Sequence, residues 1–295
     1  MLFSHASASS SAAASSPSSS SAVRLMALGD SITDGGTKHR SYRYHLHRLL
    51  QKAGLQVEWV GSMRGVFDLL KGRNASRGKP VRWQPDWPLD AQRHEGHWGW
   101  TSKQILWGHE RQPQRGFLSK WLRWAALRQQ LPQLTLVHLG TNDLTKHVAR
   151  EGESVASLAR RLRAVAQQLC RVSPRMRIFV ASPIPYCRFN KGDAREQRAR
   201  RQKLEAELAR RLHAMAARPI AECRPRQVLY VNMSEVVTCE HLIHVDGVHP
   251  SAYAAMQMAR QWLRAIEPHV RRAHTAWHPI KASPIQISEH HANGT

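Results

Sequence analysis

Acidic residues are scarce in this sequence. Only 21 Asp and Glu stand against 44 Lys and Arg in 295 residues, which gives a formal net charge of +23 at pH 7. A field of this sign attracts anionic polymers and acidic surfaces. The arginines are spread over many segments, and no RNP, zinc-finger or helix-turn-helix signature accompanies them. The charge therefore leaves two interpretations open, contact with an anionic polymer or simple solvation of helix faces, and a nucleic-acid role has no motif to support it.

Long apolar runs are also missing. The longest, such as Leu134–Leu139 and Ile178–Ala181, have the length of a strand and fall short of the roughly 18 residues that cross a bilayer. Hydrophobic residues nevertheless make up 42% of the chain, enough for a sizeable buried core. We expect a globular protein without a transmembrane segment.

Cysteine and histidine patterns typical of metal sites are absent from the sequence. The cysteines, at positions 170, 187, 223 and 239, form no C-x-x-C pair, and the histidines show no H-E-x-x-H spacing. Nothing in these spacings indicates a zinc site. An even number of cysteines in a chain of this length decides neither the disulfide state nor the compartment.

The two ends of the chain differ in composition from its centre. Residues 1–22 are almost entirely Ser and Ala, and such a tract cannot bury enough apolar surface to order itself. The tract lacks the apolar region of a secretory signal, whereas its Ser-rich, acid-free composition is also found in organelle transit peptides. A disordered leader and a transit peptide both stay open. We predict one domain over 23–270, with an insertion loop at 64–94 and a C-terminal extension over 271–295.

Strand and helix patterns alternate through the predicted domain. The strand patterns cover 23–28, 57–60, 134–139, 177–181 and 228–231, and the helical ones cover 42–53, 154–170, 194–217 and 252–266. Strands separated by helices favour a parallel sheet with helices on both faces. The predicted fold is α/β, a three-layer α/β/α sandwich with a flavodoxin-like five-stranded parallel sheet.

Polar motifs follow the predicted strands. Ser31 ends the triplet Gly29-Asp30-Ser31 after the first strand, and Asn142 follows the third. Taken alone, each residue is explained as readily as the cap of the next helix. Because ligands bind at the carboxyl ends of strands in open α/β sheets, however, the two side chains are expected at one site.

A third motif, Asp246–Pro250, follows the fifth strand and contains His249. Asp and His three residues apart on a turn can pair, as a catalytic base and its orienting carboxylate do. The alternative is an ordinary turn before the last helix. In its predicted position the motif lies at the same sheet edge as Ser31, so a nucleophile and a base converge.

These motifs resemble, in type and in order, the blocks of the SGNH (GDSL-like) hydrolase superfamily, with Gly99 as the glycine block. The resemblance implies a serine esterase with Ser31 as nucleophile, His249 as base and Asp246 as its partner. It also implies an oxyanion hole formed by the backbone N–H groups of Ser31 and Gly99 and the side chain of Asn142. Neither a metal nor an organic cofactor is required by this chemistry.

Within the superfamily, the run Glu95–Thr101, together with Gly29–Thr33 and Asp246–Pro250, looks like carbohydrate esterase family three, whose members are acetylxylan esterases. That resemblance implies removal of O-acetyl groups from sugars, with a small-molecule or carbohydrate ester as substrate. The candidate substrate contacts are Asp30, Trp98, Trp100 and Asp143.

Two alternatives remain at the level of sequence. A lipase- or lysophospholipase-like enzyme, or a general esterase of the same superfamily, would share the chemistry and differ in its pocket. A non-catalytic protein on the same fold would instead use its basic surface to bind an anionic polymer. The sequence indicates neither the oligomeric state nor the compartment.

Overall fold

A computed structural model describes residues 22–36, 41–68, 73–74, 86–188, 194–244 and 246–276. The predicted leader lies outside the described residues except for Ala22, as does the chain beyond 276 and much of the insertion loop. Within the described ranges, no helix is both long and apolar enough to cross a membrane.

The central sheet is built around β1 (Val23–Gly29), which is buried along nearly its whole length. It pairs in parallel with β2 (Val57–Val60) on one side and with β7 (Leu134–His138) on the other. Beyond β7 follow β8 (Arg177–Ala181) and β9 (Val228–Val231), also in parallel. The order β2-β1-β7-β8-β9 confirms the predicted flavodoxin-like sheet.

Two further strands join this sheet that the sequence pattern did not predict. β6 (Arg93–Gly96) runs parallel to the end of β1, and β3 (Met63–Arg64) pairs antiparallel with β6. β6 contains no apolar residue, so it shows no strand periodicity. The short strands β4 (Phe67–Asp68) and β5 (Arg73–Asn74) pair separately within the insertion.

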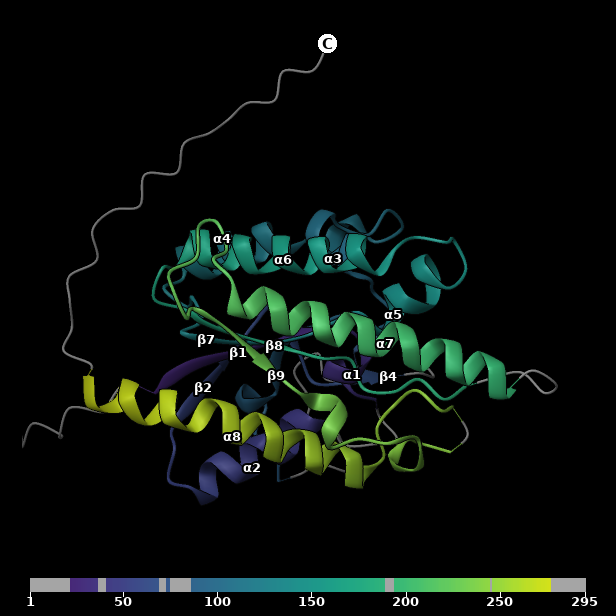
Figure 1. The fold of residues 1–295 in the computed structure, drawn as a ribbon. Helices are drawn as coiled ribbons and strands as arrows, with labels where there is room; N and C mark the ends of the chain where they lie inside the picture. Colours follow the sequence, from purple (N-terminus) through teal and green to yellow (C-terminus); the bar gives the residue numbers. More distant parts are fainter. Residues whose placement is uncertain are drawn as a thin grey trace, which may run out of the picture.

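Helices cover both faces of the sheet (Figure 1). One layer consists of α2 (Tyr42–Lys52) and α8 (Ala252–Ala276), and α8 runs past the predicted domain boundary at 270. The other layer holds α3 (Ser102–Trp107), α4 (Leu118–Leu127), α6 (Val155–Val172) and α7 (Ala194–Ala217). Short helical turns lie in the loops, and they are α1 (Ser31–Asp34), η1 (Asp90–Gln92), η2 (Pro113–Arg115), α5 (Thr141–Asp143), the π-helical η3 (Leu144–Val148), η4 (Met233–Glu235) and η5 (Cys239–His241).

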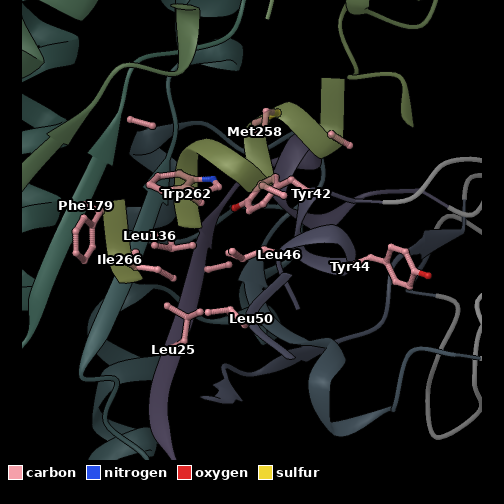
Figure 2. Packing of buried hydrophobic residues seen from close by; sticks show 14 of the residues in the cluster. Leu25, Tyr42, Tyr44, Leu46, Leu50, Leu136, Phe179, Met258, Trp262 and Ile266 are labelled. Atoms are coloured by element: carbon pink, nitrogen blue, oxygen red, sulfur yellow. The ribbon is translucent and has the colours of Figure 1, made fainter. Parts of the chain in front are cut away.

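Each face of the sheet has its own apolar cluster. Figure 2 shows the cluster between the sheet, α2 and α8, where Trp262 of α8 lies beside Tyr42 of α2, with ring centroids 6.2 Å apart. Leu25 and Leu136 supply the strand side of this cluster. Burial of one such side chain contributes about 1.5–3 kcal/mol, so the cluster holds α2 and α8 against this face of the sheet.

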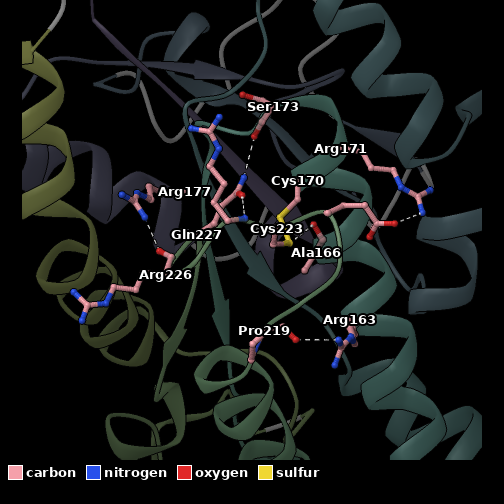
Figure 3. The surroundings of a disulfide bond; sticks show 12 residues. Arg163, Ala166, Cys170, Arg171, Ser173, Arg177, Pro219, Cys223, Arg226 and Gln227 are labelled. Atoms are coloured by element: carbon pink, nitrogen blue, oxygen red, sulfur yellow. Dashed lines mark hydrogen bonds and ion pairs between the residues drawn. A yellow bond between two sulfur atoms is a disulfide. The ribbon is translucent and has the colours of Figure 1, made fainter. Parts of the chain in front are cut away.

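Two disulfides connect segments that are distant in the described chain. Cys170, in the last turns of α6, is bonded to Cys223, which precedes β9; beside this bond the side chain of Gln227 donates to the carbonyl of Ser173 (Figure 3). The second pair, Cys187–Cys239, lies at the carboxyl ends of the strands, since Cys187 follows β8 and Cys239 follows β9.

Candidate active site

Ser31 lies where β1 ends and α1 begins. The preceding residue, Asp30, caps this helical turn, because its side chain accepts a hydrogen bond from the N–H of Ile32 at 3.0 Å. As the first residue of the helix, Ser31 presents a backbone N–H that has no intrahelical acceptor. Ser31 is 7% exposed, so only a small part of the residue is accessible to solvent.

The side chain of His249 bridges Ser31 and Asp246. Its Nε2 lies 2.9 Å from Ser31 Oγ, and its Nδ1 lies 2.9 Å from Asp246 Oδ2. A carboxylate only accepts, so Nδ1 carries the hydrogen and Nε2 is left to accept from the serine hydroxyl. Ser31 and His249 are 218 positions apart in the sequence, and these contacts connect them in one hydrogen-bond network.

Asp246 is held as an anion by its own turn. Its Oδ1 accepts from the backbone N–H groups of Val248 and His249, at 2.8 and 2.9 Å. Desolvation raises the pKa of this carboxyl, but the hydrogen bonds from the His249 side chain and from the two backbone N–H groups outweigh it and lower the pKa to about 2. The carboxylate is therefore ionised at any pH near neutrality.

Asn142 lies on α5, after β7, and its amide points to the end of β1. Its Nδ2 donates to the carbonyl of Trp100 at 2.9 Å and lies 3.4 Å from Asp30 Oδ2. The first bond fixes the plane of the amide, while the second is long and weak. One N–H of Asn142 is thus oriented toward Asp30 and the start of α1, where Ser31 lies.

In the run 95–101 only Trp98 and Gly99 are partly exposed, and the other residues are buried. The His97 ring stacks on the rings of Trp100 and Trp121, with centroids 4.4 and 4.3 Å away, and its Nε2 is 2.9 Å from Glu95 Oε1. Gly99 has φ at 76°, a conformation that glycine adopts without strain, and a Cβ there would meet open space. The backbone of Gly99 is partly exposed and is not crowded by neighbouring side chains at that position.

Trp98 stacks on His249. The ring centroids are 4.8 Å apart, and Trp98 also stacks on Phe67 of β4 at the same distance. Through Phe67 the predicted insertion loop contributes a contact to the site. Trp98, among the candidate substrate contacts, is thus beside the base and only partly exposed.

Three of the candidate substrate contacts are buried in the structure. Trp100 is 1% exposed and Asp143 is 0% exposed, and neither leaves surface for a ligand. Asp143 instead accepts from the backbone N–H of Ser102 at 2.9 Å and faces the Arg161 guanidinium at 3.4 Å. Asp30 is also fully buried, and desolvation raises its pKa to about 7 although the N–H of Ile32 opposes the shift. These three residues support the site from within.

Sequence reasoning missed Arg43, which is fully buried in α2 behind the nucleophile. Its guanidinium donates to the carbonyls of Thr33, Asp34, Gly65 and Gln92 at 2.7–2.9 Å. Burial lowers its pKa to about 10, which still leaves it charged at neutral pH. The group joins α1 to the insertion, and nothing in the local sequence distinguishes it from the many surface arginines.

The arrangement suits nucleophilic attack on a carbonyl. A serine hydroxyl, a base within hydrogen-bond reach and a carboxylate behind the base form the activated nucleophile of acyl transfer. Within the described residues, no cluster of His, Cys, Asp or Glu has the composition to hold a metal ion.

The chain is similar to a family of acylhydrolases and to a known esterase. A family model described as the GDSL-like Lipase/Acylhydrolase family matches residues 27–255. A multidomain esterase from Ruminococcus flavefaciens is 24% identical over 275 residues; the match covers 90% of this chain and 31% of that protein, so the chain spans about a third of its relative's length.

Solved structures share the fold. A carbohydrate esterase family 3 protein from Talaromyces cellulolyticus has a TM-score of 0.59 and 21% identity, with 85% of this chain and 99% of that chain covered. A family 3 carbohydrate esterase from Clostridium thermocellum has a TM-score of 0.54 and 24% identity, with 85% and 98% covered. At these identities the likeness shows the architecture.

Proposed function

The chain belongs to the GDSL-like Lipase/Acylhydrolase family, and on that premise we propose that it is a serine esterase that removes acyl groups, chiefly acetyl, from carbohydrate. The family and its esterase relatives make the matched domain a carboxylic ester hydrolase. The catalytic residues, the acyl group and the carbohydrate are the parts that we propose.

The observation that carries the proposal is the pair of 2.9 Å contacts that His249 makes with Ser31 and Asp246. In the proposed reaction His249 takes the proton of Ser31 as the hydroxyl attacks the ester carbonyl, and Asp246 stabilises the resulting imidazolium. His249 then gives the proton to the leaving alcohol, which departs and leaves an acyl-Ser31 ester. A water molecule, deprotonated by the same base, hydrolyses that ester and restores the hydroxyl.

Negative charge that develops on the carbonyl oxygen needs donors. We assign this role to the backbone N–H groups of Ser31 and Gly99 and to the Asn142 amide. Ser31 N–H is supported by its place at the start of a helix, and Gly99 by its open φ-positive turn. Asn142 would exchange its weak contact with Asp30 for the stronger bond to an oxyanion.

A small acyl group is supported by Trp98. Its indole lies against the base and next to Gly99, so it takes up room on the side where the ester must bind. Forcing extra methylenes against packed rings costs about 1–3 kcal/mol, which corresponds to roughly 10–100-fold in rate. Carbohydrate as the substrate is supported by the neighbours that are named carbohydrate esterases.

The test compares wild type with Ser31→Ala on 4-nitrophenyl acetate, butyrate and octanoate. We expect kcat/KM to be highest for acetate and to disappear in Ser31→Ala, while circular dichroism shows that the variant stays folded. Turnover in Ser31→Ala close to that of the wild type would disprove the triad. A maximum at octanoate would instead favour a lipase-like enzyme with the same triad.

The non-catalytic alternative makes a different prediction. A binding protein on this fold would not react with a fluorophosphonate probe, whereas an activated Ser31 becomes covalently labelled. Mass spectrometry of the labelled peptide, with Ser31→Ala as control, separates the two.

A further inference from the structure

A cavity of about 460 Å³ lies between η3 and α7, and arginines dominate its lining. Arg150 follows η3, Arg188 follows β8, and Arg200 and Arg201 belong to α7. Tyr186 contributes an aromatic ring, and no acidic residue is among the lining side chains that the structure describes.

The cavity adjoins the active site on two sides. Arg201 donates to Thr145 Oγ1 at 3.1 Å and to the carbonyl of Thr141 at 3.3 Å, and these residues flank Asn142. On the other side, Cys187 N–H donates to the carbonyl of Gly247 at 2.7 Å. Residues that line the cavity or stand next to its lining therefore contact the segment that carries Asn142 and the turn that carries Asp246 and His249.

Arg188 is held close to this turn. A Cβ built on Gly247 would lie 2.8 Å from the backbone nitrogen of Arg188, so the turn needs a glycine, with φ at 60°, to pass so near. The disulfide Cys187–Cys239 fixes the neighbouring residue. The start of the Arg188 side chain is thus tied to the position of the triad.

Arg201 forms the floor of the cavity and is not itself an available charge. It is 5% exposed, pairs with Glu205 at 2.7 Å and lies 4.7 Å above the Tyr186 ring. The ion pair offsets its charge and fixes its guanidinium. The ring and the guanidinium together make a rigid base.

Among the residues that the structure describes, the remaining guanidinium groups have no carboxylate partner. Arg150, Arg188 and Arg200 are exposed, and within the described ranges no carboxylate lies at ion-pair distance from any of them. Elsewhere on α7, Arg211 pairs with Glu207 at 2.8 Å. Three guanidinium groups of one sign around one cavity, with no carboxylate in its described lining, favour a ligand of opposite charge.

We propose that this cavity binds a carboxylate or sulfate group on the sugar chain whose ester is cleaved, so that the substrate is an acidic polysaccharide. The proposal rests on the proposed esterase function. Guanidinium groups bind carboxylate and sulfate oxygens through paired N–H donors. An anionic lipid fits less well, because the lining offers an acyl chain only Ala149 and Leu204 as aliphatic side chains.

The first test uses the full chain and three acetylated trisaccharides: neutral xylotriose, trigalacturonate and a sulfated galactotriose, with 4-nitrophenyl acetate as reference. We expect kcat/KM for an acidic probe to exceed that for xylotriose by about tenfold, and 0.5 M NaCl to reduce the preference because salt screens exposed charges. The two acidic probes distinguish carboxylate from sulfate. Equal kcat/KM on all three sugars would overturn the proposal.

The second test compares Arg188→Gln/Arg200→Gln with Arg218→Gln/Arg224→Gln. The control changes the same number of charges beside a different cavity, at the far end of α7. We expect the ratio of acidic to neutral kcat/KM to fall about tenfold in the first variant, mainly through KM, and to stay at the wild-type value in the control. An equal fall in both would show a general charge effect and overturn the site.

Two other outcomes are distinguishable. If wild type cleaves an ester in phosphatidylglycerol vesicles faster than any sugar, and Arg188→Gln/Arg200→Gln removes that preference, the cavity serves a lipid and the proposal is wrong. If the wild type hydrolyses neither 4-nitrophenyl acetate nor any sugar acetate, the esterase function itself has failed.

Discussion

Trp98 stacks on the ring of His249, with centroids 4.8 Å apart and planes inclined by 21°. The contact joins the glycine-containing run 95–101 to the turn that carries the base. Phe67 also stacks on Trp98, with ring centroids 4.8 Å apart, so Trp98 is held by contacts with two rings. An imidazolium that forms during catalysis would gain from lying over the indole face.

Trp98→Leu should lower kcat about tenfold with little change in KM, because the ring that orients His249 and favours its charged form is lost. Trp98→Phe keeps a ring face and should retain most of the activity. Trp107→Leu is the control, since Trp107 is 64% exposed and away from the base. Steady-state kinetics on 4-nitrophenyl acetate measures all three. Equal losses in Trp98→Leu and Trp98→Phe would contradict an orienting role for the ring.

Asp246→Asn should lower kcat by about 10³–10⁴, because an amide can present its N–H to His249 and hold the wrong tautomer. The overall fold should be retained, as shown by an unchanged circular dichroism spectrum. A loss of less than tenfold would mean that another group orients the base.

The same carboxyl makes stability depend on pH. Its pKa is about 2 in the folded chain and 3.8 in an unperturbed Asp, so folding favours the ionised form. The resulting stabilisation is fully present above about pH 4 and is lost as the pH falls toward 2. Urea midpoints at pH 5 and pH 2.5 should therefore differ more in wild type than in Asp246→Asn, and equal differences would refute the link.

Asn142→Ala should lower kcat by about 10²–10³, the usual cost of removing one oxyanion donor. KM should change little, since the donor acts on charge that develops in the transition state. A variant with normal kcat but a lower Tm would show that Asn142 only holds Trp100 in place through its 2.9 Å bond.

Asp143→Ala should destabilise the fold by about 1–3 kcal/mol, because the buried N–H of Ser102 loses its acceptor, while Arg161 keeps its pair with Glu153. The exposed pair Arg64–Asp90 supplies a control, since Asp90→Ala should leave the urea midpoint almost unchanged. If Asp143→Ala raised KM without lowering stability, Asp143 would be a substrate contact after all.

The two disulfides should differ in what they support. Replacing either pair of cysteines with serine should lower the free energy of unfolding by about 2–4 kcal/mol. Only Cys187→Ser/Cys239→Ser should also lower kcat/KM, because Cys187 holds the carbonyl of Gly247 next to the triad. The pair Cys170–Cys223 lies before β8 and β9, at the opposite edge of the sheet. Equal kinetic effects of the two replacements would contradict this assignment.

Local patterns in the sequence were enough to predict the frame of the fold. Five apolar runs at strand length, separated by helical periods, predict the order of the parallel sheet, because crossover handedness leaves few alternatives. The positions of Ser31, Asn142 and His249 follow from the same rule, since the carboxyl ends of parallel strands meet at one edge. The spacing of Asp246 and His249 is also local, which is why the pair could be anticipated.

What the tertiary structure decided depends on contacts between distant residues. Local patterning cannot show that Trp98 would face the base while Trp100, two positions on, would be buried. Four cysteines allow three pairings, and only the folded chain brings particular ones together. Arg43 and β6 gave no signal, because their polar groups are satisfied by backbone and side chains far away in sequence. Periodicity reports which face of an element is buried, whereas the partner that a side chain meets there is fixed only when the elements pack.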